Sequence, residues 1–417
     1  MLQSKLFTKV TKEAPKDEVS FNGKILIQAG FVDKLSAGVF TFLPLGLRVL
    51  NKISNIIREE MDKIGGEEIL MPVLVQKENW TATGRWETLD VLFKLAGSDE
   101  KEYALGATHE EVVTPLAKKF VFSYRDLPIM PYQIQTKFRN ELRAKSGIMR
   151  GREFLMKDLY SFHTDQADLD RFYEIAKQAY FKVFKRLGLG EITYLTYASG
   201  GAFSKYSHEF QTLCPAGEDI IYICDNCHVA INREIIAEQT QCPICGNKKF
   251  REDKAVEVGN IFKLGNRFSS AVDFKYLDKD GVSKDLAMGC YGLGPSRAMG
   301  AVVEVCHDAK GIIWPEEIAP FRVHLILLGK KDSWEKNKVE ADKLYEKLIA
   351  QGVEVLYDER EEKGPGEKFA EADMIGCPIR LVISDKTLAE ESVEVKKRSG
   401  ADSKLVKIES SVKDLIA

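Results

Sequence analysis

The sequence lacks the features that mark membrane, secreted and strongly charged proteins. No apolar run approaches the roughly 20 residues that span a bilayer. The N-terminal stretch has no apolar core and becomes acidic early, at Glu13, Asp17 and Glu18, which argues against a signal or transit peptide. The net charge is only −3, so local patches would have to attract any nucleic acid. We therefore expect an intracellular, cytoplasmic protein with no membrane partner.

Cysteine is too sparse for a disulfide scaffold, with 8 cysteines in 417 residues. Four of them form two C-x-x-C pairs, Cys224 with Cys227 and Cys242 with Cys245. Each pair presents two thiolates on one side of a turn, and two pairs complete a closed tetrahedral zinc site. A redox pair is the alternative, but two pairs at this spacing disfavour it. A site with four protein ligands has no open position, so the predicted zinc is structural.

The pattern of the chain predicts an α+β protein with roughly two to three domains. Amphipathic helices at residues 47–64 and 165–187 lie among short strands, and the composition breaks at Trp314-Pro315 and Ala319-Pro320. Beyond this break, strands alternate with helices, which favours an α/β domain with a parallel or mixed sheet. We therefore predict domains at residues 1–319 and 320–417, with a zinc-ribbon-like insertion at 220–250.

The central feature is a hairpin between Gln133 and Phe162. Its first strand alternates polar and apolar residues, which predicts a half-buried strand, and a basic loop with Arg143, Lys145, Arg150 and Arg152 follows it. The strand places Arg139 near Glu141, and the returning strand carries Phe154. This layout suits a polyanion with a planar base, because guanidinium pairs bidentately with phosphate and an aromatic ring offers a stacking face. An exposed basic hairpin with a surface ion pair explains the same residues equally well.

Residues 105–120 predict a strand that turns into a helix. Thr108 and Glu111 have capping-box spacing, which gives the threonine a purely structural role. The cap does not need Glu110, which could be held by the helix dipole or could anchor a ligand ammonium together with Thr108. Further along, His208 and Glu209 close a loop of small residues, and we interpret both as structural.

A glycine-rich turn precedes the helix that begins near Ser296. A dinucleotide fingerprint would need a third glycine where Arg297 stands, so we reject that interpretation. Gly292 and Gly294 allow close approach to the backbone, and Arg297 lies in the first helical turn, where an anion could bind. A tight turn with an exposed arginine is the alternative.

Taken in order, these segments closely resemble the bacterial-type prolyl-tRNA synthetases, a family of class II aminoacyl-tRNA synthetases. Helix 47–64 and the following strand, 67–74 with Pro72, resemble motif 1, which builds the dimer interface; an ordinary helix and edge strand is the alternative. KFRNE through GREFLMKD resembles motif 2, and GCYGLGPSR resembles motif 3. ATHEE and EVGNIFKLG match segments of the prolyl branch.

The resemblance implies an antiparallel catalytic sheet, a C-terminal anticodon-binding domain and a homodimer that joins L-proline to tRNA(Pro) with ATP and Mg²⁺. The implied catalytic residues are Arg139, Glu141 and Arg297. The implied ATP-binding residues are Arg139, Glu141, Arg150, Arg152, Phe154, Gly292, Gly294 and Arg297. The implied proline-binding residues are Thr108, Glu110, Arg139, Glu257 and Asn260. Asp358, Arg360 and Lys368 are anticodon candidates by position at a strand end.

The chain departs from the family's pattern in three places. The motif 2 loop has RNELRAKSG where the family usually has RDEIRPRFG, and Asn260 replaces a frequent histidine. The long editing insertion between motifs 2 and 3 is missing, so we predict no removal of mischarged alanine within this chain. A paralogue without catalysis is disfavoured because the ATP-binding residues are present. A threonyl or glycyl enzyme is disfavoured because ATHEE and EVGNIF occur together.

Overall fold

The computed structural model describes residues 1–416 apart from Arg143, Lys145, Ala202 and Ser204, so two basic residues of the hairpin loop lie outside it. The chain divides into two compact units. The first contains residues 1–34, 41–52 and 302–417, and the second contains residues 35–40 and 53–301. No helix among the described residues is long and apolar enough to cross a membrane.

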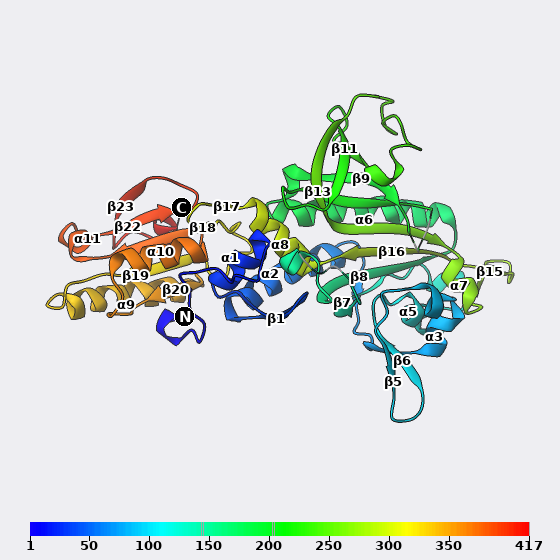
Figure 1. Cartoon of the computed structure of the whole chain (residues 1–417), viewed down its shortest axis with the longest axis horizontal. Helices are drawn as coiled ribbons and strands as arrows, with labels where there is room; N and C mark the ends of the chain where they lie inside the picture. Colours follow the sequence, from blue (N-terminus) through cyan, green and yellow to red (C-terminus); the bar gives the residue numbers. More distant parts are fainter. Residues whose placement is uncertain (143, 145, 202, 204, 417) are drawn as a thin grey trace. The chain divides into compact units, whose positions relative to one another are not determined.

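A nine-stranded sheet forms the centre of the second unit (Figure 1). Its strands in spatial order are β10 (Tyr206–Leu213), β9 (Thr193–Ser199), β12 (Val229–Asn232), β11 (Asp219–Cys224), β13 (Arg251–Gly265), β16 (Ala287–Leu293), β8 (Glu153–His163), β7 (Pro131–Phe138) and β3 (Glu67–Glu68). Only β12 with β9 and β3 with β7 pair in parallel, which confirms the predicted antiparallel sheet. Strand β10 also pairs with β13, so five strands close into a ring.

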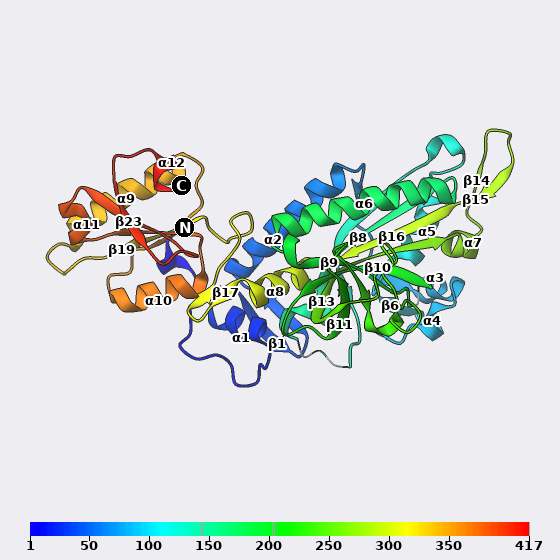
Figure 2. The ribbon, with the colours of Figure 1, turned by 90° about the horizontal axis from the view of Figure 1, so that it is seen from above.

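One long helix, α6 (Gln166–Arg186), packs along β8, β13 and β16 (Figure 2). The Asp165 side chain caps its first turn, and its buried face includes Phe172, Tyr173, Tyr180 and Phe184. Smaller elements complete the unit: β4 (Leu74–Gln76), α3 (Lys77–Ala82), α4 (Arg85–Thr88), β5 (Lys94–Ala96), β6 (Glu102–Leu105), α5 (Glu110–Ala117), α7 (Arg267–Ala271), β14 (Lys275–Leu277) and β15 (Ser283–Asp285). Helices α2 (Pro44–Asp62) and α8 (Pro295–Val305) have residues in both units.

The predicted hairpin is present as β7 and β8, with Gln133 opposite Asp158 and Phe138 opposite Glu153. Two residues of its polar face are buried more deeply than its apolar face. Gln133 and Lys137 are fully buried, while Ile134 is partly exposed. The reason is Asp158 on β8, which accepts from Gln133 Nε2 at 3.0 Å and pairs with Lys137 Nζ at 2.8 Å, so the polar face is satisfied inside the protein.

One prediction of a continuous strand is wrong. The expected strand at 67–74 is broken into β3 and β4 around Pro72, because proline has no N–H to donate to a ladder.

The first unit contains a five-stranded sheet in the order β20 (Val355–Asp358), β19 (Val323–Leu327), β21 (Ile379–Ile383), β22 (Ser392–Lys397) and β23 (Ser403–Lys407). The sheet is mixed, which is one of the two predicted alternatives. Its helices are α1 (Phe21–Gln28), α9 (Trp334–Ala350), α10 (Pro365–Ile375), α11 (Asp385–Ala389) and α12 (Val412–Leu415), and its short strands are β17 (His307–Asp308) and β18 (Gly311–Ile312). Strands β1 (Val32–Ser36) and β2 (Val39–Phe42) have residues in both units. The expected linker is packed, since Trp314 is buried and its Nε1–H donates to the carbonyl of Ile375 at 3.0 Å.

Candidate active site

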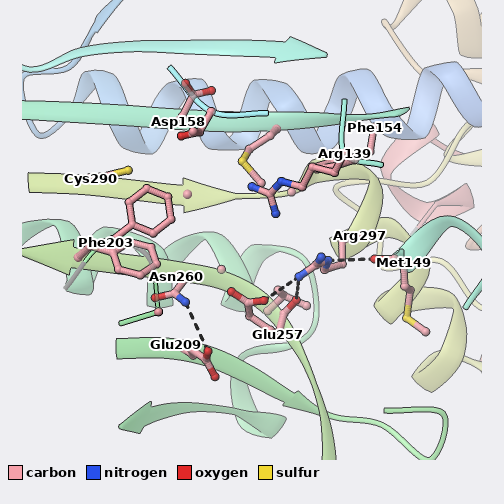
Figure 3. A pocket seen from close by; sticks show the side chains of 18 of the residues that line it. Arg139, Met149, Phe154, Asp158, Phe203, Glu209, Glu257, Asn260, Cys290 and Arg297 are labelled. Atoms are coloured by element: carbon pink, nitrogen blue, oxygen red, sulfur yellow. Dashed lines mark hydrogen bonds and ion pairs between the residues drawn. The ribbon is translucent and has the colours of Figure 1, made fainter. Parts of the chain in front are cut away.

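A cavity of about 280 Å³ lies where the β7–β8 hairpin, β13, β16 and the start of α8 meet (Figure 3). Most of the ATP-binding and proline-binding residues predicted from the sequence line it: Thr108, Arg139, Phe154, Glu257, Asn260, Gly292, Gly294 and Arg297. These residues come from segments that are far apart in the chain. The fold therefore brings the segments that resemble motifs 2 and 3, together with ATHEE and EVGNIFKLG, to one site.

Two arginines from different segments face this cavity. Arg139 follows the end of β7, and Arg297 lies in the first turn of α8, where Pro295 opens the helix. Loss of solvent, and then the positive charge of Arg297, lower the pKa of Arg139. The Arg139 guanidinium lies 5.3 Å from the centre of the Phe154 ring. Two cations that repel each other across a cavity form a natural anion site.

Contacts within the unit fix the orientation of Arg297. Its Nε donates to the carbonyl of Met149 at 2.9 Å, and one terminal nitrogen donates to the carbonyl and to the Oε2 of Glu257, both at 2.9 Å. Glu257 thus holds the arginine in place and at the same time lines the wall of the cavity. These bonds orient the guanidinium before any ligand binds.

A second space of about 220 Å³ adjoins the first and shares Arg139, Met149, Glu257 and Arg297 with it. Glu141 and Arg150 line this space and pair at 2.9 Å, and Arg150 also pairs with Glu218. Arg152 lines neither space, because its side chain donates to the carbonyl of Glu141 at 3.0 Å. Arg152 therefore holds the backbone of the hairpin loop at Glu141 and does not face either cavity.

The predicted ammonium site is built differently from the expected one. Thr108 does not cap α5; its hydroxyl donates to Glu110 at 2.5 Å, so the capping-box explanation is wrong. Glu110 is fully buried and reaches the cavity only through Thr108 and Cys290, which bond to its two oxygens and line the wall.

Behind this wall, Arg85 pairs with Glu110 at 3.1 Å and with Glu111 at 3.0 Å. The Arg85 side chain is 2% exposed, and its guanidinium lies over the rings of Phe203 and Phe268. Burial raises the pKa of Glu111, with Glu110 acting in the same direction and Arg85 against it. Sequence reasoning missed Arg85, because nothing near it in the chain indicates that it lies against residues 110 and 111.

Glu209 is a second residue that sequence reasoning misplaced. We interpreted it as structural, yet it lines the cavity and accepts from Gln211 at 2.8 Å and Asn232 at 3.1 Å. Asn260 donates to its other oxygen at 3.4 Å (Figure 3). Burial, and then the nearby Glu257, raise the pKa of Glu209. The alternation along β10, with Glu209 and Gln211 on one face, is the signal that could have found it.

Comparison with known proteins places the chain in a family. The model of the class II tRNA synthetase core domain (G, H, P, S and T) matches residues 93–306, and the model of the anticodon binding domain matches residues 322–417. A proline–tRNA ligase of Sulfurihydrogenibium sp. is 34% identical, with 100% of this chain and 99% of that protein covered. One of Rhizorhabdus wittichii is 36% identical, with 100% and 99% covered. The chain belongs to the proline–tRNA ligase family.

A solved structure has the same fold. Prolyl-tRNA synthetase of Giardia lamblia, in complex with prolyl-adenylate, matches with a TM-score of 0.79, 21% identity and coverage of 94% of this chain and 77% of that one. The class II core and the anticodon-binding domain predicted from the sequence are thereby confirmed, and as a member of this family the chain is an aminoacyl-tRNA ligase.

The four predicted metal ligands of this family member come together. The sulfurs of Cys224, Cys227, Cys242 and Cys245 all lie within 4.8 Å of one another. Cys224 and Cys245 are 3.7 Å apart, close to the ~3.8 Å that tetrahedral Zn–S bonds of about 2.3 Å require. The side-chain N–H of Asn247 donates to Cys224 Sγ at 3.6 Å, as expected of a thiolate. The strand β11, which carries Cys224, belongs to the large sheet, so the cysteine-bearing segment is part of the second unit and not a separate domain.

The three anticodon candidates form an internal ion cluster in the first unit. Asp358 and Lys368 have no exposed side-chain surface, and Arg360 is 11% exposed. Arg360 pairs with Asp358 at 2.8 Å and with Glu371 at 2.7 Å, while Lys368 donates to the carbonyl of Leu327 at 2.8 Å. Direct contact with a nucleotide needs exposed surface, which Asp358 and Lys368 do not have.

Proposed function

We propose that this protein activates L-proline with ATP to prolyl-adenylate and transfers the prolyl group to the 3′ end of tRNA(Pro). The observation that carries the proposal is the pair Arg139 and Arg297, which face one cavity from two distant segments. Attack of a carboxylate on the α-phosphate needs no side-chain nucleophile. It needs positioning and charge stabilisation, and guanidinium groups held in advance provide both.

The roles of the ATP-binding residues follow from where they lie. Arg139 binds the α-phosphate and the proline carboxylate, and Arg297 binds the γ-phosphate while the adenine stacks between it and Phe154. Gly292 and Gly294 add no side chain to the wall, so the nucleotide can approach the backbone. Glu141 and Arg150 line the adjoining space, where they would meet the adenine side and the distal phosphates. Carboxylates such as Glu257 and Glu218 line this space and would offer the oxygen ligands that Mg²⁺ prefers, and the ion would neutralise part of the phosphate charge.

The ammonium of the imino acid binds at the Thr108 hydroxyl. This hydroxyl donates its proton to the buried Glu110 at 2.5 Å, so its oxygen is left as an acceptor beside a negative charge. Arg85 holds the Glu110 carboxylate in position from behind, at 3.1 Å. Glu257 and Asn260 close the opposite side of the pocket.

The substitution Glu110→Gln tests this assignment, because it keeps the size of the side chain and removes its charge. We expect kcat/KM for proline in proline-dependent ATP–pyrophosphate exchange to fall by ~10²-fold, since a hydrogen bond to a charged group is worth about 1.5–3 kcal/mol. Glu111→Gln is the matched control: it removes a carboxylate that shares Arg85 but does not contact Thr108. Exchange by Glu110→Gln at the parental rate would refute the role of Glu110.

Several finer properties belong to the same proposal. The cysteine cluster holds a structural zinc ion, and its four thiolates fit that metal.

The protein is a cytoplasmic homodimer that associates through α2 and the segment around Pro72, which light scattering can test. The domain boundary lies between residues 319 and 320, supported by the ranges of the two family models. Of the anticodon candidates, Arg360 is the one with surface to offer a nucleotide.

A further inference from the structure

A separate cavity of about 330 Å³ lies on the other side of the strands that wall the substrate cavity. On β10, His208 lines this cavity and its neighbour Glu209 lines the substrate cavity. On β13, Lys263 lines this cavity and its neighbour Phe262 lines the substrate cavity. Adjacent residues of a strand point to opposite faces, so the two spaces are back to back and do not merge. We call this second space the rear cavity.

The walls of the rear cavity are aromatic. Tyr173 comes from α6, Tyr197 from β9, and Tyr206 and His208 from β10. The rings of Tyr197 and His208 meet edge to face, with centroids 4.6 Å apart. Tyr206 is 49% exposed and stands at the edge. A slot of this kind favours a flat ring, because offset stacking and edge contacts both add to the burial of apolar area.

The hydrogen bonds of His208 determine what it offers to a ligand. Tyr173 Oη donates to the carbonyl of Ile261 at 3.1 Å, since a carbonyl can only accept. We assign this single phenolic proton to the carbonyl, and therefore the tautomer in which His208 Nδ1, 2.7 Å away, donates to the tyrosine oxygen. Burial, with the positive charge of Lys177, lowers the pKa of His208 to about 4, so the ring is neutral. Its Nε2 therefore carries a lone pair, and no residue that the structure describes donates to it.

The edge of the rear cavity offers a second acceptor. Glu238 lines it and accepts from Tyr206 Oη at 2.8 Å. The other charged residue in the lining, Lys263, pairs with Asp170 at 2.7 Å and lies over the Tyr173 ring at 4.8 Å. The two acceptors, His208 Nε2 and the Glu238 carboxylate, favour a ligand with N–H donors.

We propose that the rear cavity binds a planar heterocycle with an exocyclic amino group, as in adenosine or in an unpaired adenine of RNA. The ring stacks among the tyrosines, and the amino group donates to His208 Nε2 and Glu238. A cavity of about 330 Å³ lies at the small end of the range for ligand sites and suits a ligand of nucleoside size. The site is distinct from the substrate cavity and uses none of the residues assigned to the ligase reaction.

Calorimetric titration of adenosine into the full-length protein tests the proposal, with the substrate cavity first filled by a non-reactive prolyl-adenylate analogue. We expect one saturable site per chain. His208→Phe keeps the ring and removes the acceptor, so affinity should fall about tenfold, the value of one hydrogen bond. Tyr197→Leu should weaken binding by a similar factor. Tyr222→Leu, on β11 outside the cavity, is the matched control and should bind as the parent does.

Purine riboside, which lacks the amino group, should bind about tenfold more weakly than adenosine. Titration with a short oligoadenylate distinguishes an RNA base from a free nucleoside, according to which of the two binds more tightly. The absence of saturable binding by both, or equal binding by the parent and the His208→Phe variant, would overturn the proposal. Failure of the analogue to bind would count against the ligase assignment instead, and the comparison of the parent with the cavity variants would still report on the rear cavity.

Discussion

At the scale of the residue, Arg85 is the least replaceable side chain behind the substrate cavity. It is buried with two carboxylates, and its guanidinium lies over two aromatic rings. Arg85→Met leaves both carboxylates buried without a cation, so we expect a loss of stability of ~3–5 kcal/mol. Urea unfolding measures it, with Arg152→Met, a substitution of a partly exposed arginine, as the control. A loss below about 1 kcal/mol, the value of a surface pair, would contradict the arrangement.

Lys157 is a second buried charge, on β8. Its Nζ donates to the carbonyl of Tyr291 at 3.1 Å and to the hydroxyl of Tyr180, and its burial lowers the pKa to about 7. The unfolded chain thus binds more protons than the folded protein between about pH 7 and the ordinary lysine pKa of about 10.4. Stability should therefore rise with pH in this window, by up to about 1.4 kcal/mol per pH unit from this group.

Urea unfolding of the parent and of Lys157→Met from pH 6 to pH 9 checks the expectation. The difference in stability between them should change with pH above 7 and be constant below it. A difference that stays constant over the whole range would show that the lysine titrates as an exposed one does.

At the scale of the element, the two cysteine turns are attached to the large sheet through β11 and β12. Strands β11 and β12 pair with β13 and β9, so metal removal should loosen only the turns themselves. We expect a chelator to release one zinc ion per chain and to increase hydrogen exchange at residues 224–247. Exchange in β7 and β8 serves as the internal control. Loss of protection there too would mean that the metal holds the whole catalytic sheet.

At the scale of the whole molecule, the chain is shorter than many of its relatives. The alignment with the Sulfurihydrogenibium protein is 566 positions long against 417 residues here, so at least 149 positions have no counterpart in this chain. We expect no hydrolysis of alanyl-tRNA(Pro) above background. We also expect measurable charging with alanine, because each missing methylene costs only ~1–3 kcal/mol of discrimination. Rapid deacylation by the purified protein would contradict this.

The elements that the sequence predicted well are those whose pattern is local. Helix α6 was found from its apolar spacing and its stop at Gly188, and the four cysteines from their spacing. The buried polar face of β7 was not found, because Gln133 and Lys137 look like surface residues until Asp158 is placed opposite them. The same holds for Asp358 and Lys368, whose charges are satisfied inside the fold.

The sequence by itself determined the family, the order of the motifs and the residue types that bind phosphate and metal, since these depend on chemistry and spacing along the chain. The tertiary structure decided which charges meet: Arg85 with Glu110, Glu209 with Asn260, and Arg297 with Glu257. Each of these contacts joins segments from different strands or helices. Burial raises the free energy of an unpaired charge, so a buried charge needs a partner of opposite sign. Which charges are buried depends on the folded chain and not on the local sequence.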